Sequence, residues 1–381
     1  MILIMKTRAV LMFEQYCKSE KTKVSYNFLI TKFVKHYNLD SYDAILEIDS
    51  KVLFRMIEDY VVLLKNGNKS TSYIRNHIFA IKSFCEANDK YDVNFRKVCK
   101  LVEKQKPKKT RPYTTAEIKR MLHSVKSLRN KALILFLSSS GVRVGALSLL
   151  KIGHLKQMPF GCVAVTVYDG CNEEYVTFIN KEANDYLTLY LEERKHNGEI
   201  ITNDSPVFRL QFSSTSQKEK MMTEASVTQM LIRTKINAGV NFEGTPNLLC
   251  HALRRRFNTI FKLREGANPT LIERLMGHDQ RLDNSYFQPT LEQLFTEYQK
   301  GMADLTIDDA ERLLVERKEV EQKISEFEVQ KQEQISIKEQ MNILAKNQAK
   351  MNHIMEMIVN GDVTLVSKNN EKITLDLIKS E

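Results

Sequence analysis

The sequence predicts a mainly α-helical protein with one small antiparallel β-hairpin and a coiled coil toward its C-terminal end. Apolar residues recur at helical spacing through most of the 381 residues. Two short apolar runs flank the turn Asp169-Gly170, which is typical of a hairpin. Residues 308 to about 359 contain no glycine or proline, and apolar residues there recur in steps of four and three.

Composition divides the chain into four predicted segments. Residues 1–104 are expected to form a helical domain, and residues 105–112 a basic linker. Residues 113–305 combine helical patterns with the hairpin and are expected to form a second, α+β domain. Residues 306–381 are expected to form the coiled-coil helix and a small terminal hairpin.

The first segment shows four apolar helical faces and no strand pattern. Ser70 is a plausible N-cap, and the apolar residues from Ile74 to Phe84 that follow it lie at helical spacing. The other helices are expected within Ala9–Tyr16, Tyr26–Val34 and Val52–Leu64.

The linker is unusually basic. It reads Lys-Gln-Lys-Pro-Lys-Lys-Thr-Arg-Pro from residue 104, with no acidic residue. Prolines and like charges favour an extended, solvated conformation. It is either a simple connector or a strap along phosphates, and we favour the strap. The candidate DNA contacts are Lys106, Lys108, Lys109 and Arg111.

The second domain begins near Tyr113. Thr115 starts a capped helix with Glu117 in its first turn, and a buried helix covers Arg129–Ser138. The hairpin strands are expected at Val163–Tyr168 and Tyr175–Ile179. Later helices are expected at Lys181–Lys195, Glu224–Ala238, Asn247–Arg264 and Pro269–Met276.

The charge balance indicates a polyanionic partner. A net charge of +10 and a pI near 9.1 favour nucleic acid over an acidic membrane surface. No apolar run approaches the roughly 20 residues of a membrane span. The six cysteines form no CxxC pair, so we expect reduced thiols, a cytoplasmic location, and neither a metal site nor a cofactor.

Four cationic side chains are candidates for one phosphate site. Arg143 follows a buried helix and lies between Gly141 and Gly145, while His251 and Arg254 lie one turn apart on a helix and point to one face. His278 follows Gly277, a helix-ending residue. Singly, each could be a structural group; together they suit a bidentate phosphate clamp. Arg255 is a further candidate DNA contact.

A tyrosine follows at a suitable distance. Tyr286 lies in a polar loop eight residues after His278, and Tyr298 is a second candidate farther on. Tyr286 could be a packing anchor instead. Spacing favours Tyr286 as the residue that attacks the bound phosphate.

The order Arg143, His251-x-x-Arg254, Gly277-His278 and Tyr286 resembles the tyrosine recombinase (phage integrase) family over about residues 113–300. The helical N-terminal segment resembles that family's core-binding domain. The resemblance implies that Tyr286 forms a 3′-phosphotyrosyl link and frees a 5′-hydroxyl. It also implies that the two arginines and His278 stabilise the phosphorane, while His251 assists proton movement.

The chain departs from the family pattern at two positions. The hairpin turn, which in the family holds a lysine that protonates the leaving 5′-oxygen, here has Asp169 at the aligned position. Either Lys181, just past the second strand, replaces that lysine, or the general acid is weak or missing. Ala146 stands where the family has an acidic residue.

Three functions therefore follow from the resemblance. The first is a site-specific DNA recombinase or integrase acting on double-stranded DNA in a tetrameric synapse. The second is a DNA-binding protein of the same fold with weak or lost strand cleavage, and the third is a type IB topoisomerase. The predicted coiled coil either packs on the protein's own body or joins copies of the chain. We favour self-association, which argues mildly against the topoisomerase.

Overall fold

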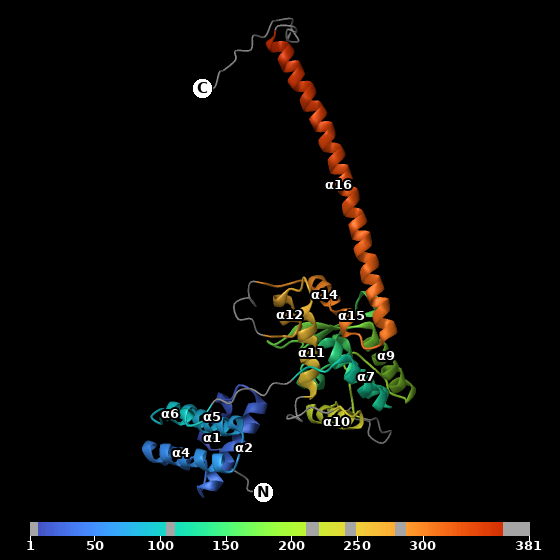
Figure 1. Cartoon of the computed structure of the whole chain (residues 1–381). Helices are drawn as coiled ribbons and strands as arrows, with labels where there is room; N and C mark the ends of the chain where they lie inside the picture. Colours follow the sequence, from blue (N-terminus) through green and yellow to red (C-terminus); the bar gives the residue numbers. More distant parts are fainter. Residues whose placement is uncertain (1–6, 104–110, 211–220, 241–248, 279–286, 361–381) are drawn as a thin grey trace. The chain divides into compact units, whose positions relative to one another are not determined.

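The computed structural model describes residues 7–103, 111–210, 221–240, 249–278 and 287–360. The chain forms two compact units, Met1–Lys109 and Thr110–Glu381 (Figure 1). In the described residues, no helix is long and apolar enough to cross a membrane.

The first unit is a helical bundle. Its helices are α1 (Arg8–Tyr16), α2 (Glu20–His36), α3 (Ala44–Glu47), α4 (Ser50–Asn66), α5 (Thr71–Ala87) and α6 (Phe95–Lys100). Ser70 caps α5 by accepting a hydrogen bond from the backbone N–H of Tyr73, as predicted. The apolar faces meet in one core, in which Phe13, Phe33 and Phe84 are completely buried. The four predicted helices are confirmed, whereas the short α3 and α6 were not predicted.

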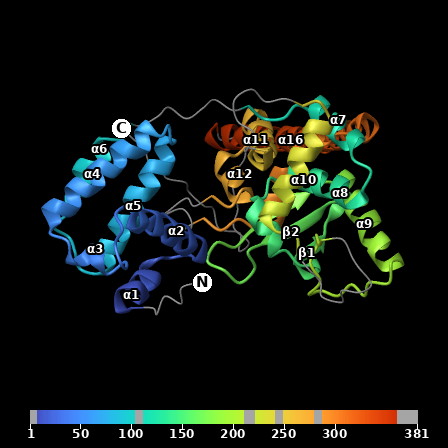
Figure 2. The same cartoon turned by 90° about the horizontal axis from the view of Figure 1, so that it is seen from below.

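The second unit combines helices with a three-stranded sheet (Figure 2). Its first elements are α7 (Thr115–Ser124), α8 (Leu128–Ser140), β1 (Leu155–Gln157), β2 (Val163–Val167), β3 (Tyr175–Ile179) and α9 (Lys181–His196). The later elements are α10 (Glu224–Asn237), α11 (Leu249–Leu263), α12 (Pro269–Leu275), α14 (Leu291–Gln299), α15 (Met302–Leu305) and α16 (Asp309–Val359). Short 3₁₀ turns occupy Val144–Ser148, Ile152–His154 and Pro159–Gly161.

The sheet is antiparallel in the order β1-β2-β3. Leu155 pairs with Val165, and Val163 pairs with Ile179, so β2 is the central strand. The predicted hairpin is confirmed, and Gly170 in its turn has a φ of +71°. β1 was not predicted, because it has only three residues and two of them are exposed.

Helix α8 is the centre of the second unit. All residues from Ala132 to Ser140 are buried, which explains why its sequence is apolar on every face. It packs against α9, α11 and β3. A neighbouring apolar cluster joins β3, α11, α12 and α14 around Phe178, Phe257 and Tyr298. These contacts bring the C-terminal ends of α8 and α12 close to α11.

Helix α16 runs without a break from Asp309 to Val359, through the polar stretch 328–334 (Figure 1). Its first turns are attached to the unit: Lys181 pairs with Glu311 at 3.3 Å, and Arg264 with Glu319 at 3.1 Å. The long helix is confirmed, and its coiled-coil pairing stays a prediction. The proposed terminal hairpin, residues 362–378, lies outside the described residues.

Candidate active site

The end of α8 positions Arg143. The helix stops at Gly141, which has a φ of +62°, and a Cβ there would lie 2.7 Å from the ring of Phe257. Any larger residue would therefore separate α8 from α11. The chain turns, and the Arg143 guanidinium donates a hydrogen bond to the carbonyl oxygen of Gly277 at 2.8 Å.

The end of α12 supplies that carbonyl. Gly277 has a φ of +60°, and its N–H donates to the carbonyl of Arg274 at 2.8 Å. The N–H of His278 donates to the carbonyl of Glu273 at 3.0 Å, which completes a Schellman motif. A Cβ on Gly277 would lie 2.3 Å from the Tyr175 ring. The glycine thus lets α12 end against β3 and present His278.

Arg254 closes the arrangement from α11. It is 7% exposed and donates to the carbonyls of Gly141 at 2.6 Å and Met276 at 2.5 Å. Burial lowers the pKa of Arg254, although a guanidinium stays protonated in proteins. Arg143 and Arg254 therefore bind adjacent carbonyls, 277 and 276, directly before His278. We call these three side chains the phosphate cradle.

Tyr175, the first residue of β3, lies beside the cradle. Burial raises the pKa of this phenol, while the positive charges of Arg254 and then Arg143 act to lower it. A neutral phenol is a hydrogen-bond donor. Sequence reasoning missed Tyr175, although its position directly after the hairpin turn was a usable signal.

Glu273 orients His278. The carboxylate contacts Nδ1 of the imidazole with one oxygen and the ammonium group of Lys262 with the other. Burial acts to raise the pKa of Glu273, but the hydrogen bonds from Lys262 and His278 outweigh it, and the net shift is downward. The carboxylate is therefore ionised, and it leaves Nε2 of His278 as the ring nitrogen for a ligand.

Arg274, which the sequence did not single out, holds the chain next to Tyr286. Its guanidinium donates to the carbonyl oxygen of Phe287 at 2.6 Å. Tyr286 itself lies outside the described residues. Its C-terminal neighbour is thus fixed to α12, the helix that presents His278.

The remaining candidates are placed less centrally. His251 is exposed, one helical turn before the buried Arg254. Arg255 is partly buried on α11. Arg111 is bound to Glu117 by two hydrogen bonds of 2.8 and 2.6 Å, with its side chain 52% exposed. Lys106, Lys108 and Lys109 lie outside the described residues.

Tyr298 is a core residue. It is completely buried, and its hydroxyl forms a 2.8 Å hydrogen bond with Oγ of Ser139. Burial raises its pKa well above the usual value, which makes ionisation harder. A nucleophile needs access to DNA, so Tyr298 is the wrong candidate and Tyr286 is retained.

The hairpin turn keeps its acidic character in the folded chain. Oδ2 of Asp169 lies 3.7 Å from Nε2 of His154, and Glu174 accepts a hydrogen bond from the Gly170 N–H at 2.8 Å. His154 Nδ1 accepts from the backbone N–H of Lys151 at 3.2 Å, so Nε2 carries the proton of the neutral ring. His154 thus has its Nε2–H toward the Asp169 carboxylate.

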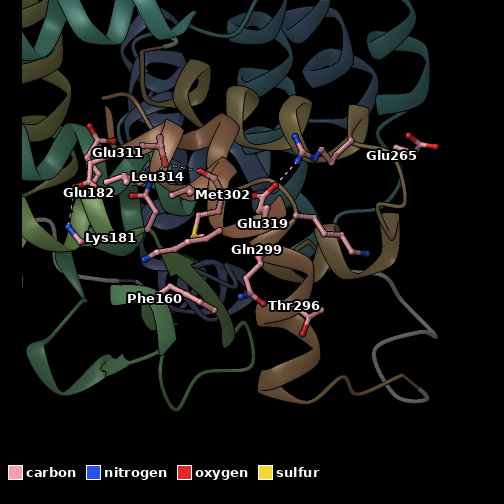
Figure 3. A pocket seen from close by; sticks show the side chains of 16 residues that line it. Phe160, Lys181, Glu182, Glu265, Thr296, Gln299, Met302, Glu311, Leu314 and Glu319 are labelled. Atoms are coloured by element: carbon pink, nitrogen blue, oxygen red, sulfur yellow. Dashed lines mark hydrogen bonds and ion pairs between the residues drawn. The ribbon is translucent and has the colours of Figure 1, made fainter. Parts of the chain in front are cut away.

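Lys181 does not replace the missing lysine. It lies past the opposite end of β3 from Tyr175, and its ammonium group pairs with Asp185 at 2.6 Å and Glu311 at 3.3 Å. Figure 3 shows it lining a cavity of about 420 Å³ beside the first turns of α16. The cradle residues do not line this cavity. The suggestion that Lys181 serves the turn was therefore wrong.

Known proteins share this arrangement of elements. Residues 112–286 match the model of the phage integrase family. Tyrosine recombinase XerC of Rickettsia bellii (strain OSU 85-389) is 25% identical over 294 residues, which cover 74% of this chain and 90% of that protein. Tyrosine recombinase XerD of Oceanobacillus iheyensis is 25% identical over 270 residues, covering 68% and 84%.

Two solved structures share the fold. The Tn1549 transposon integrase in complex with transposon right end DNA aligns with a TM-score of 0.54 at 17% identity, covering 77% of this chain and 98% of that one. The XerH site-specific recombinase bound to palindromic difH substrate aligns with a TM-score of 0.51 at 20% identity, covering 69% and 74%. The family model that matches residues 112–286 and the two sets of relatives support the assignment of this chain to the tyrosine recombinase (phage integrase) family.

Proposed function

We propose that this protein is a site-specific DNA recombinase that cuts and rejoins double-stranded DNA through a 3′-phosphotyrosyl intermediate. The observation that carries the proposal is the cradle, in which Arg143 and Arg254 are fixed to adjacent carbonyls immediately before His278. The relatives named tyrosine recombinases XerC and XerD support the same assignment.

The cradle suits a phosphate whose charge grows during attack. Each guanidinium has five N–H donors, more than the hydrogen bonds to carbonyls 141, 276 and 277 use. Because these bonds fix the arginines before DNA arrives, little reorganisation is needed when the phosphorane forms. When both ring nitrogens of His278 carry a proton, Nδ1–H is held by Glu273 and Nε2–H donates a further hydrogen bond to the phosphate.

The proposed reaction exchanges one phosphoester bond for another. The Tyr286 oxygen forms a bond to phosphorus while the bond from phosphorus to the 5′-oxygen breaks. His251 takes the phenolic proton, and the leaving 5′-oxygen must gain one. Since Asp169 stands where the family has its lysine, we expect protonation of the leaving group to be slow.

The proposal extends to partners and location. Lys106, Lys108, Lys109, Arg111 and Arg255 are proposed contacts to DNA phosphates, with Arg111 released from Glu117 on binding. Four copies would form the synapse in which strands are exchanged. We place the reaction in the cytoplasm, at the nucleoid or in a host cell if the gene is viral.

The second candidate is a DNA-binding protein that has lost efficient cleavage. The acidic hairpin turn favours it, because the described part of that turn contains no lysine. A pool of nicked duplexes with varied sequence separates the two functions. The nick lets the short cleaved fragment that carries the free 5′-hydroxyl diffuse away, so the covalent adduct accumulates.

We expect an adduct with the wild type and with Tyr298→Phe, but none with Tyr286→Phe. Denaturing gels would detect it as a shifted protein band. An adduct with Tyr286→Phe would refute the assigned nucleophile. If the protein binds the duplexes but forms no adduct with any of them, the second candidate is favoured. Relaxation of supercoiled plasmid by a single copy of the protein would favour the topoisomerase.

A further inference from the structure

The outer part of α16 exposes a regular apolar stripe. Ile337, Met341, Leu344, Met351 and Met355 have 56% to 67% of their surface exposed. Exposed apolar side chains in such a row indicate a surface that another molecule covers.

The stripe has the spacing of a coiled coil. Ile337, Leu344, Met351 and Ile358 occupy d positions, and Met341, Gln348 and Met355 occupy the intervening a positions. The stripe is about 33 Å long at the rise of an α-helix. It is long enough for three heptads, so a pair of these helices can bury a continuous seam.

The protein's own body does not cover this stripe in the described residues. The hydrogen bonds and ion pairs between α16 and the rest of the second unit end at Glu319. Ile337 lies about 27 Å farther along the helix axis. A rigid helix of this length keeps the stripe away from the elements that hold its first turns.

The polar residues beside the seam fit a second copy of the same helix in parallel. Glu333 occupies a g position and Lys338 the following e position, so parallel helices in register pair them with opposite charges. Gln348, at an a position, would meet the partner's Gln348 and could hydrogen-bond to it. An antiparallel pair would instead set Glu333 and Lys338 against the apolar end near Ile358.

We propose that residues 334–358 of α16 form a parallel two-stranded coiled coil with a second copy of this chain, in the absence of DNA. This pairing goes beyond the proposed recombination and does not depend on it. It would hold two copies together before either binds a site.

Matched variants of neighbouring residues test the seam. Leu344 at d is 67% exposed, and Ile343 at c, outside the seam, is 60% exposed. In light scattering of the full chain, the wild type and Ile343→Glu should have about twice the 44.2 kDa chain mass. Leu344→Glu should shift to the single-chain mass at the same concentration.

Three results would overturn the proposal: a wild type of single-chain mass, a wild type of four-chain mass, or the same response from both variants. Circular dichroism would check that each variant keeps its globular helices. Leu344→Glu should then differ from Ile343→Glu in mass and in the thermal unfolding of α16, but not in the thermal unfolding of the globular helices.

Cysteine crosslinking tests the direction. In a parallel pair, Gln334→Cys places the two new thiols opposite each other, whereas an antiparallel pair separates them by about 36 Å. Under mild oxidation we expect Gln334→Cys chains to crosslink to one another. The yield of crosslinked dimer should exceed that of the wild type, and the excess should be lost in the Leu344→Glu background. Crosslinks between Gln334→Cys and Ile358→Cys chains, in place of self-crosslinks, would overturn the parallel arrangement.

Discussion

Glu273 links helix α12, on which it lies, to both Lys262 and His278. It lies on α12, accepts from Lys262, and holds His278, whose backbone N–H also binds the Glu273 carbonyl. Carboxylates that orient metal-bound histidines typically contribute a factor of 10 to 100 in metal affinity or activity, and we expect a comparable factor in rate here. We therefore propose that Glu273 is a positioning residue that acts through His278.

Replacement of Glu273 by Gln should slow adduct formation about tenfold or more and leave DNA affinity within about twofold. The amide keeps the shape but removes the charge that orients the ring. Single-turnover cleavage and equilibrium DNA binding separate the two quantities. Lys262→Met is the control, since it removes the other partner of the carboxylate. Equal losses in rate and affinity would indicate a purely structural role.

Asp169 offers a test by gain of function. A general acid contributes about 10² to 10⁴ in rate, and the turn holds an acid where the family has lysine. Asp169→Lys should therefore speed the cleavage of the nicked duplexes by at least about tenfold. Glu173→Lys makes the same charge change within the turn and should give a smaller increase. Equal acceleration by both would mean that stronger DNA binding, not proton donation, is responsible.

The sequence motifs identified Arg143 and His278, each of which lies close to a glycine. Gly141 and Gly277 mark the ends of α8 and α12, and these helix ends place Arg143 and His278. Glu273 and Arg274 were missed because their roles arise from contacts that leave no local signal in the sequence, such as the Arg274 bond to residue 287. Tyr175 does follow the hairpin turn directly, but the contact of its ring with Gly277 could not be read from the sequence.

At the scale of elements, the ion pair of Arg111 with Glu117 joins the linker to α7. Glu117 also completes the capping box with Thr114. The pKa of Glu117 is lowered to about 2, and the hydrogen bonds from Arg111 are the largest cause. Its unfolded value is about 4.5, so the ionised form is favoured in the folded chain.

The stability that Glu117 contributes is therefore present above pH 4.5 and is lost as the pH falls toward 2. At neutral pH we expect Glu117→Gln to lower the free energy of unfolding of the second unit by up to about 3 kcal/mol. The difference in free energy of unfolding between the wild type and Glu117→Gln should disappear as the pH falls from about 4.5 to about 2. Denaturant titrations at several pH values measure it. A gap that does not change with pH would show that the charge is not the cause.

Element type was predictable where the pattern was long. The buried α8 carries a continuous apolar run, the hairpin carries two apolar runs on either side of a turn, and α16 carries a repeating apolar pattern. Helix α14 was missed although Thr290 and Gln293 form a capping box, a local signal that could have identified its start. Helix α15 and strand β1 are too short for periodicity to distinguish them from loops.

At the scale of the whole molecule, the proposed coiled coil and the cradle would act at different stages. The cradle would determine how fast a bound phosphate is cut, and the seam would determine how many copies arrive together. A tether raises the local concentration of the second copy without any new contact to DNA. Loss of the seam should then affect steps that need two copies and leave cleavage by one copy unchanged.

Leu344→Glu should therefore form the covalent adduct on a nicked single binding site at the wild-type rate. On a duplex with two binding sites, it should need about tenfold or more protein to reach half-maximal paired occupancy, because the second copy must bind from solution. At high protein concentration the difference should disappear. Ile343→Glu, which alters α16 outside the seam, should follow the wild type throughout. Protein titrations on both substrates distinguish the outcomes. Slower adduct formation by Leu344→Glu on the single site would mean that the substitution affects folding or chemistry. Identical curves for Leu344→Glu and the wild type on the double site would show that the seam does not tether the copies on DNA.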